Sequence, residues 1–324
     1  PPGGSEGPSC RSTFDVSQFI VRRLAFSAVA LIGATVMVFG LSRLSGDPRL
    51  LYMGAEGYGI TPEQYQALGR ELALDRPLAV QYLTWIGHAA RGDLGKSIVG
   101  RQSVSKLIKE KLPATLKLGL AAWVFAVAAG VPLGVLSAVR RGSLIDYVAR
   151  GTAVLGQSLP SFWIGIVAIL VFAVQLRLLP SLGRGDSFKE FVLPTITLAW
   201  LPLAGFVRLT RSAMLDVLDT EYVKLARAKG ASSWRVVGKH AFRNALIAPL
   251  TLSGLLLASL MTGSVVVESV FSWPGIGRLA LQAVTDNDFP VLSGVVLMFT
   301  AMYILANFTV DILYAVVDPR IRLT

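Results

Sequence analysis

Six long stretches of apolar residues constrain this chain more than any other feature of its sequence. The hydrocarbon core of a bilayer is about 30 Å thick, and roughly 20 residues of helix cross it. Backbone polar groups in lipid need partners within their own segment, so an all-α integral membrane protein is predicted. The six expected membrane-spanning helices are Phe19–Leu44, Leu116–Val139, Val148–Leu176, Phe191–Met214, Leu246–Phe271 and Pro290–Val317.

The composition agrees with a polytopic membrane protein and narrows the functions open to it. Hydrophobic residues make up 53% of the chain and charged residues 16%, against about 25% charged residues in soluble domains. One cysteine and two histidines exclude an intrachain disulfide and a zinc site rich in Cys and His. The net charge of +11 can indicate nucleic-acid binding, but basic cytoplasmic loops explain it better in a membrane protein.

Basic residues gather at one set of ends of the six segments and so predict the orientation of the chain. Cytoplasmic loops carry an excess of Lys and Arg. The basic clusters all fall on one side if both termini are cytoplasmic, and they comprise Arg22, Arg23, Arg140, Arg141, Arg208, Arg211, Lys224, Arg227, Lys229, Arg235, Lys239, Arg243, Arg320 and Arg322. The predicted topology therefore has the N-terminus and the C-terminus inside.

Four regions follow from this topology. Residues 1–13 are rich in Pro, Gly and Ser and are predicted to be a disordered tail. The first membrane helix lies within residues 14–45. Residues 46–113 form an extracytoplasmic segment with helices expected at 61–74, 78–91 and 104–112, which either dock a partner or pack as a lid on the bundle. The core transmembrane domain, 114–324, contains a cytoplasmic loop at 215–245.

Residues 220–243 of that loop, here called the elbow, are predicted to form two short helices joined at a glycine. Asp219 or Thr220 can cap the first helix, and Gly230 suits the left-handed residue that ends one. A serine at position 232 or 233 can cap the second helix. The loop also fits a basic helix-turn-helix for DNA, but the flanking membrane helices would hold a recognition helix near the bilayer.

Three other motifs are expected to have structural explanations. The stretch Ala90–Ser97 fits a relaxed phosphate-binding loop, but a helix rather than a strand is expected before it and the site would lie outside the cell. Gly130 and Gly134 permit close helix approach, and ordinary packing inside the bundle is the preferred interpretation. Pro160 and Pro202 are expected to kink or begin helices.

Glu268 is an ionisable residue near the outer end of the fifth apolar segment. An intramembrane carboxylate suggests a functional site by default. The sequence leaves two possibilities equally open, namely that Glu268 faces a translocation path or that it pairs with Arg278.

The elbow resembles the coupling-loop signature of permeases from binding-protein-dependent ABC importers, and in particular their dipeptide, oligopeptide and nickel branch. The resemblance rests on the stretches Glu221–Ser232 and His240–Leu246. Only Ala226 and Gly230 match the general signature strictly, since Lys224-Leu225-Ala226 stands where that signature has Glu-Ala-Ala. Further agreeing stretches are Leu44–Pro48, Gly92–Ser97, Ser158–Phe162, Glu268–Gly277 and Asp318–Arg322. The large outer segment resembles the B-type permease of such systems.

This resemblance implies a type I ABC importer transmembrane fold and a set of functional residues. It implies contact with an ATPase through Glu221, Tyr222, Ala226, Arg227, Ala228, Lys229, Gly230, Ala231, Ser232, His240, Arg243 and Asn244. It makes Ser158, Ser161 and Glu268 candidates for the translocation path. No catalytic or metal-binding residue is expected.

The resemblance also implies partners and a location. The partners are a second permease, two ABC ATPases that bind ATP and Mg²⁺, and an extracytoplasmic substrate-binding protein, with no nucleic acid. The chain itself would hold no cofactor and would be a multi-pass protein of the cytoplasmic membrane of a bacterium or archaeon. The expected cargo is di- and oligopeptides. The alternatives are a permease for nickel or another small solute, or a secondary transporter that works without an ATPase.

Overall fold

The computed structural model describes residues 16–44, 74–183, 187–262 and 264–317, with isolated positions between 61 and 70. The regular elements of these residues are helical, apart from one antiparallel bridge between Lys96 and Ser103. The predicted tail, and most of the helix expected at 61–74, lie outside the described residues.

The helices form one bundle with an outer layer. In chain order they are α1 (Val16–Leu44), α4 (Leu78–Ala90), α5 (Val104–Val139), α6 (Leu144–Ser158), α7 (Ser161–Ala168), the π-helix η1 (Ile169–Gln175), α8 (Phe188–Leu218), α9 (Glu221–Ala228), α10 (Ser233–Arg235), the π-helix η2 (Val236–Phe242), α11 (Arg243–Ala245), α12 (Ile247–Thr262), α13 (Val265–Val270), α14 (Ile276–Thr285) and α15 (Phe289–Val317).

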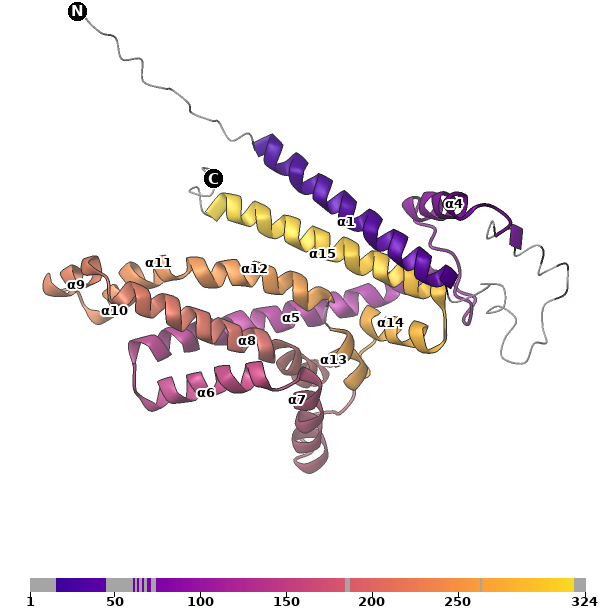
Figure 1. Ribbon diagram of the computed structural model, residues 1–324. Helices are drawn as coiled ribbons and strands as arrows, with labels where there is room; N and C mark the ends of the chain where they lie inside the picture. The colour runs from indigo at the N-terminus through magenta and orange to yellow at the C-terminus, as the bar shows by residue number, and fades with distance from the viewer. Residues whose placement is uncertain are drawn as a thin grey trace, which may run out of the picture.

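Figure 1 shows how these helices are arranged. Helices α5, α6, α8 and α12 lie along one another, and α1 and α15 pair beside them. The elbow helices α9 and α10 lie at one end of the bundle, with the start of α1 and the end of α15 pointing the same way. Helices α4, α13 and α14 lie at the opposite end. This arrangement is the one that the predicted topology requires.

The centre of the bundle is α8, which packs against α5, α6 and α12. Two glycines of α5 bring it against α8 at close range. A Cβ atom on Gly130 would overlap Phe206, and one on Gly134 would overlap Thr210 and the carbonyl oxygen of Val207. Small residues allow this approach, so the predicted packing role of both glycines is confirmed.

A buried polar network joins the same three helices near the elbow end. The Asp146 carboxylate of α6 is 1% exposed and accepts hydrogen bonds from Arg211 Nε of α8 at 2.8 Å and from Ser137 Oγ of α5 at 2.6 Å. The Gly142 backbone N–H donates to its second oxygen at 3.0 Å. The network therefore fixes the helices against each other where the elbow begins.

The span expected at Val148–Leu176, with Pro160 kinking or beginning a helix, is a pair of helical segments that meet at a sharp bend. Helix α6 ends at Ser158, and the chain resumes with α7 and η1 at an angle of 111°. Pro160 lies in the break and has no N–H, so it cannot bond to the Gly156 carbonyl and continue α6. The expected kink at Pro160 is therefore a full change of direction, whereas Pro202 lies inside the continuous helix α8.

Two further segment boundaries differ from the prediction. The helix expected at 104–112 does not end there but is the first part of α5, a single helix of 36 residues that continues past Pro113. The fifth apolar segment is divided into α12 and α13. The helix expected at 78–91 is confirmed as α4.

The number of membrane spans in the described residues is smaller than predicted. Three helices are long and apolar enough to cross a membrane, Val104–Val139, Phe188–Leu218 and Phe289–Thr309. The bent pair of α6 with α7 and η1 would make a fourth span. The apolar parts Ala25–Gly40 and Ile247–Leu257 are shorter, so the count of six spans is not confirmed.

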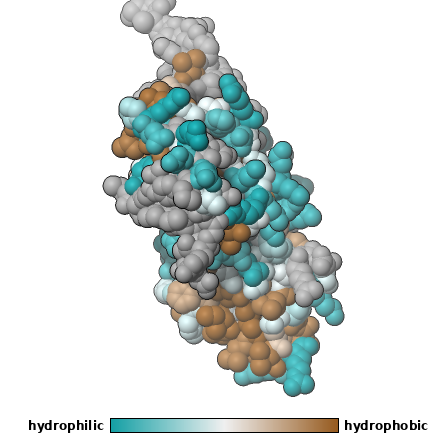
Figure 2. All heavy atoms as spheres, turned by 90° about the vertical axis from the view of Figure 1, so that its right-hand side faces the viewer, coloured by the Kyte–Doolittle hydropathy of each residue, from teal (hydrophilic) through white to brown (hydrophobic). Residues whose placement is uncertain are grey.

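Helix α4 and the arm formed by α7 and η1 lie at the outside of the bundle. Helix α4 packs on α1, where Tyr82 stacks edge-on against Phe39 and shares a hydrogen bond of 2.8 Å with Thr35. The arm formed by α7 and η1 leaves the bundle sideways, and Figure 2 shows apolar residues gathered at the bottom of the outer face, where this arm lies. Its exposed side chains include Trp163 and Ile166.

A matched pair of glycine substitutions tests the contact between α5 and α8. We expect Gly134→Ala to destabilise the protein by about 1–3 kcal/mol, because the new methyl group must push α8 away. Gly151→Ala on α6, where a Cβ meets nothing within 4 Å, should be neutral or stabilising by up to about 1 kcal/mol. Thermal unfolding of the purified protein measures both, and equal melting temperatures for the two variants would contradict the packing role.

Candidate functional site

The elbow is a rigid projection because its inner face is buried. Val223 of α9 is fully buried and packs in a cluster with Met214 and Leu218 of α8, Val236 and Ala241 of η2, and Ala138 of α5. Thr220 occupies the N-cap position of α9, although its hydroxyl donates to the Val217 carbonyl instead of capping. Helix α9 is therefore packed directly on α8, and the same cluster includes α5.

The turn between the two elbow helices is the one predicted from the sequence. Gly230 has φ +78°, a left-handed conformation that favours glycine, and Ser232 is at the N-cap position of α10. The second helix changes its geometry, since α10 has only 3 residues and continues without a gap as the π-helix η2.

Hydrogen bonds bring three of the predicted coupling residues together across the elbow. Asn244 Nδ2 donates to Tyr222 Oη at 2.8 Å and to the His240 carbonyl at 3.1 Å. Tyr222 Oη donates to the same carbonyl at 3.3 Å. These bonds tie α9 to η2 and α11, so the two halves of the elbow are held together.

The outer face of the elbow carries the remaining coupling residues. Arg227, Ala228, Lys229, Gly230, Ser232 and Arg243 are exposed, Ala226 and Ala231 are half-buried, and Glu221 forms an ion pair with Lys224 at 2.8 Å. Two large apolar side chains that the sequence analysis did not single out lie on the same projection, Trp234 at 84% exposure and Leu225 at 56%. Both could have been noticed in the sequence, because each is a large apolar residue in a loop rich in basic residues.

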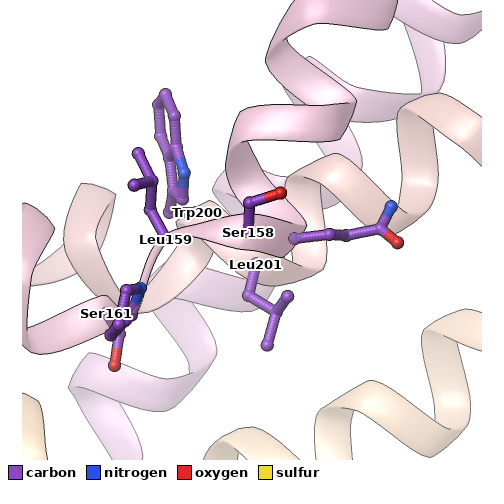
Figure 3. Close-up of a pocket in the computed structure, with 7 residues that line it drawn as sticks. Ser158, Leu159, Ser161, Trp200 and Leu201 are labelled. Carbon is purple, nitrogen blue, oxygen red and sulfur yellow. The ribbon is translucent and has the colours of Figure 1, made fainter.

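The break between α6 and α7 forms a pocket of about 320 Å³, here called the bend pocket. It is lined by Gln157, Ser158, Leu159, Pro160, Ser161, Trp200 and Leu201, and Figure 3 shows the two serines on either side of the break. Ser158 Oγ donates to the Val154 carbonyl at 2.9 Å, which leaves its lone pairs as acceptors. The structure thus brings two candidate path residues, Ser158 and Ser161, to one pocket.

Glu268 does not line the bend pocket. Its side chain is 0% exposed and accepts hydrogen bonds from Thr115 Oγ1 at 2.8 Å, Ser264 Oγ at 2.7 Å and the backbone N–H of Arg278 at 3.0 Å. The Arg278 guanidinium instead donates to the Ser272 carbonyl at 2.8 Å. The contact between Glu268 and Arg278 is therefore made through the backbone.

The carboxylate of Glu268 holds the N-terminus of α14. It bonds to the third N–H of that helix, while Thr115 Oγ1 accepts from the first, Ile276, at 2.8 Å. A Cβ atom on Gly275 would overlap this carboxylate. An anion at a helix N-terminus is stabilised by the unpaired N–H groups and the helix dipole. Glu268 thus links α13, α14 and α5.

The loop that resembles a phosphate-binding motif is a structural connector. It follows the helix α4 rather than a strand, and Gly92 and Gly95 have φ values of +84° and +81°. Ser97 Oγ donates to the buried Asp288 at 2.5 Å, and Gly100 N donates to Ser97 Oγ at 2.8 Å. These bonds fasten the loop to the turn before α15.

The chain matches a known family of membrane proteins over most of its length. The family described as the inner membrane component of binding-protein-dependent transport systems matches residues 130–323, and its N-terminal domain matches residues 16–119. The chain belongs to this family. It is a permease subunit of an ABC importer and not an enzyme, since the ATPase of such systems lies in partner subunits.

Individual relatives cover nearly the whole chain. The dipeptide transport system permease protein DppB of Escherichia coli K12 is 40% identical, over 94% of this chain and 98% of the relative. The di/tripeptide transport system permease protein DppB of Pseudomonas aeruginosa is also 40% identical, with the same coverage.

Solved structures show the same fold at low identity. A chain of the MetNI methionine ABC transporter in an inward-facing conformation aligns with a TM-score of 0.53 and 20% identity, covering 65% of this chain and 96% of that one. An amino acid ABC transporter crystallised with histidines gives 0.52 and 18%, covering 64% and 93%. The predicted type I ABC importer transmembrane fold is therefore confirmed.

Removing the charge of Glu268 tests its structural role. We expect Glu268→Gln to destabilise the outer end of the protein by roughly 1–3 kcal/mol, because one carboxylate oxygen becomes an amide N–H₂ that faces a donor, either the Arg278 backbone N–H or the hydroxyls of Thr115 and Ser264. Glu221→Gln, at an 89% exposed side chain on the elbow, is the matched control and should change stability little. Thermal unfolding and limited proteolysis compare the two, and a wild-type melting temperature for Glu268→Gln would refute the assignment.

Proposed function

We propose that this chain is one of two membrane permeases of an ATP-driven importer for di- and oligopeptides. The observation that carries the proposal is the match over 94% of the chain to permeases named for dipeptide and di/tripeptide transport. In this assembly the second permease completes the translocation path and two ATPase subunits bind ATP and Mg²⁺. An extracytoplasmic binding protein delivers the peptide. The location is the cytoplasmic membrane of a bacterium or archaeon.

The elbow couples ATP binding to movement of the bundle. Its outer face offers exposed Leu225 and Trp234 together with basic side chains, which suits a protein partner with an apolar groove and acidic rim. Its inner face packs on α8 and α5 through the hydrophobic cluster around Val223. Closure of the ATPases would push on α9 and shift the helices that line the path.

The bend pocket supports a path formed with a second permease. The pocket is open at the surface of this chain, and its wall comes only from α6, α7 and α8. A second permease facing this side would close the wall. Ser158, Ser161 and Gln157 would then present polar groups to a peptide backbone, while Leu201 contacts its side chains.

Nickel or another small solute remains the alternative cargo within the same family. The residues that the structure describes contain no group of three His, Cys, Asp or Glu side chains placed to hold a metal ion. The bend pocket is lined by amide, hydroxyl and apolar groups, which suit an organic solute better than a soft or borderline metal ion. These features favour the peptide.

Purification of the intact assembly tests the proposal. The chain is isolated in mild detergent from its native membrane, and its companions are identified by mass spectrometry. We expect a second permease and two ATPase subunits, and reconstituted vesicles with the binding protein should accumulate a labelled dipeptide when ATP is supplied. A chain that purifies alone in several mild detergents, or an assembly that carries nickel but no peptide, would refute the proposed function.

Gly230 provides a second test through the coupling step. We expect Gly230→Leu to abolish ATP-driven uptake while membrane insertion is retained, because leucine is strained at φ +78° and would protrude at the exposed turn. Gly230→Asn should keep most of the uptake, since asparagine tolerates the left-handed region. Normal uptake by the leucine variant would rule out a coupling role for this turn.

A further inference from the structure

The buried face of α6, which packs on α8 and α5, consists of small residues beyond its first turn. Its buried positions there are Ala149, Ala153 and Gly156, which recur at helical spacing. A Cβ atom on Gly156 would overlap Ala204 of α8, so the two helices are in close contact. A face of this kind has no large side chains that interlock with grooves of α8, so it does not by itself fix how far α6 lies along that helix.

Asp146, in the first turn of α6, supplies the directional contacts that the small residues lack. Among the residues that the structure describes, the side-chain hydrogen bonds that join α6 to other helices all involve this carboxylate. Arg211 of α8 donates to its two oxygens through Nε at 2.8 Å and Nη2 at 3.2 Å, and Ser137 of α5 donates at 2.6 Å. A bidentate pair fixes orientation as well as distance. These three residues are here called the inner anchor.

The inner anchor is a buried ion pair and not a surface contact. The side chains of Asp146 and Arg211 are 1% and 21% exposed. Ion pairs at the surface contribute little, whereas separating a buried pair leaves an uncompensated charge. The Ser137 hydroxyl also accepts a hydrogen bond from Arg211 Nε at 3.0 Å, so the three side chains form a closed set. The inner anchor therefore holds α6 at one position on α8.

Both partners of Asp146 lie at the base of the elbow. Ser137 directly precedes Ala138 of α5, and Arg211 lies three positions before Met214 of α8. Ala138 and Met214 belong to the buried cluster on which Val223 of α9 packs. The anchor and the support of the elbow are thus within one helical turn of each other. The position of α6 follows the same helix ends that carry the elbow.

The other end of α6 forms part of the wall of the bend pocket. Ser158 lies twelve positions beyond Asp146, about 18 Å along the helix axis. Trp200 and Leu201 of α8 also line the pocket, and Figure 3 shows them with Ser158 around the break. Helices α6 and α8 run side by side (Figure 1), so a shift of α6 along α8 displaces Ser158 relative to Leu201. The shape of the pocket thus depends on a contact that lies outside it.

We propose that Asp146 is a positioning residue for transport, which sets the register of α6 on α8 and thereby couples the bend pocket to the elbow. The inference rests on the proposed function, because it takes the bend pocket as part of the translocation path. Packed helices change their relative position by small sliding movements. When the elbow moves, the inner anchor carries α6 with α5 and α8, and Ser158 moves with it. Without the anchor, α6 slides on its small residues and the pocket no longer follows the elbow.

A cysteine in the bend pocket reports this coupling. Ser158→Cys is combined with Cys10→Ser, because Cys10 is the only cysteine of the chain. The intact assembly with its binding protein is treated with a charged thiol reagent, with or without ATP. We expect ATP to change the reaction rate several-fold, and Asp146→Asn to remove this response. Glu110→Gln, at an exposed carboxylate of the outer part of α5, is the matched control and should retain the response.

Substitutions of the two partners separate positioning from stability. Arg211→Lys keeps a cation beside Asp146 and should retain most of the ATP response, whereas Arg211→Gln should lose it. Ser137→Ala removes one hydrogen bond but keeps the ion pair, so the anchor can be tested even if Asp146→Asn does not assemble, and it should give an intermediate response.

Two results would overturn the inference. One is a reaction rate at Ser158→Cys that does not depend on ATP in the otherwise unmodified assembly. The other is an unchanged response in assembled Arg211→Gln and Ser137→Ala, even with a lowered melting temperature, because a residue that only stabilises the fold gives that result.

Uptake and ATP hydrolysis, measured in the same vesicles, provide a second readout. Asp146→Asn should lower uptake of labelled dialanine roughly tenfold, the factor for loss of a hydrogen bond to a charged group, while ATP hydrolysis is retained. An equal loss of both activities in the assembled variant would contradict a positioning role. If the unmodified assembly carries no dialanine, the proposed function fails, whereas the ATP response of Ser158→Cys needs no peptide and still tests Asp146.

Discussion

The close contact between α5 and α8 is the constraint on which the rest of the bundle depends. Gly130 and Gly134 let the two backbones approach until α8 is enclosed on that side, and Gly156 does the same for α6 against Ala204. In lipid, helices associate through such packing and through interhelical hydrogen bonds rather than through the hydrophobic effect. The bonds of Asp146 to Arg211 and Ser137 add the polar contribution at the elbow end.

The elbow depends on the same arrangement. Helix α9 is short and would not be stable alone, since isolated helices of this length are marginal in water. Its stability comes from Val223, which inserts between the ends of α8 and η2. The elbow is therefore supported from beneath by the central helix α8. Trp234 and Leu225 lie outside this buried cluster and stay exposed on the projection.

The sequence predicted features that depend on local chemistry and missed those that depend on contacts between distant residues. The left-handed turn at Gly230 and the packing of Gly130 and Gly134 follow from the lack of a side chain, which is visible in one sequence. The proline at position 160 predicted a kink. The size of the bend, 111°, could not be predicted, because the residues on both sides of the proline are similarly apolar. The pairing of Asp146 with Arg211 joins residues 65 positions apart, and no local pattern specifies it. The partners of Glu268 come from α5, α13 and α14, so its role required the fold.

The position of Glu268 has a consequence for where this molecule can change shape. One buried carboxylate accepts hydrogen bonds from three segments of the chain, and separating any of them would remove one of its donors. The outer ends of α5, α13 and α14 therefore behave as one rigid block. At the break between α6 and α7, Pro160 removes a backbone donor, and beyond it α7 packs on α8 and on α13 of this block. A transport cycle would strain the molecule least if it turned about that break and carried the Glu268 block as a unit.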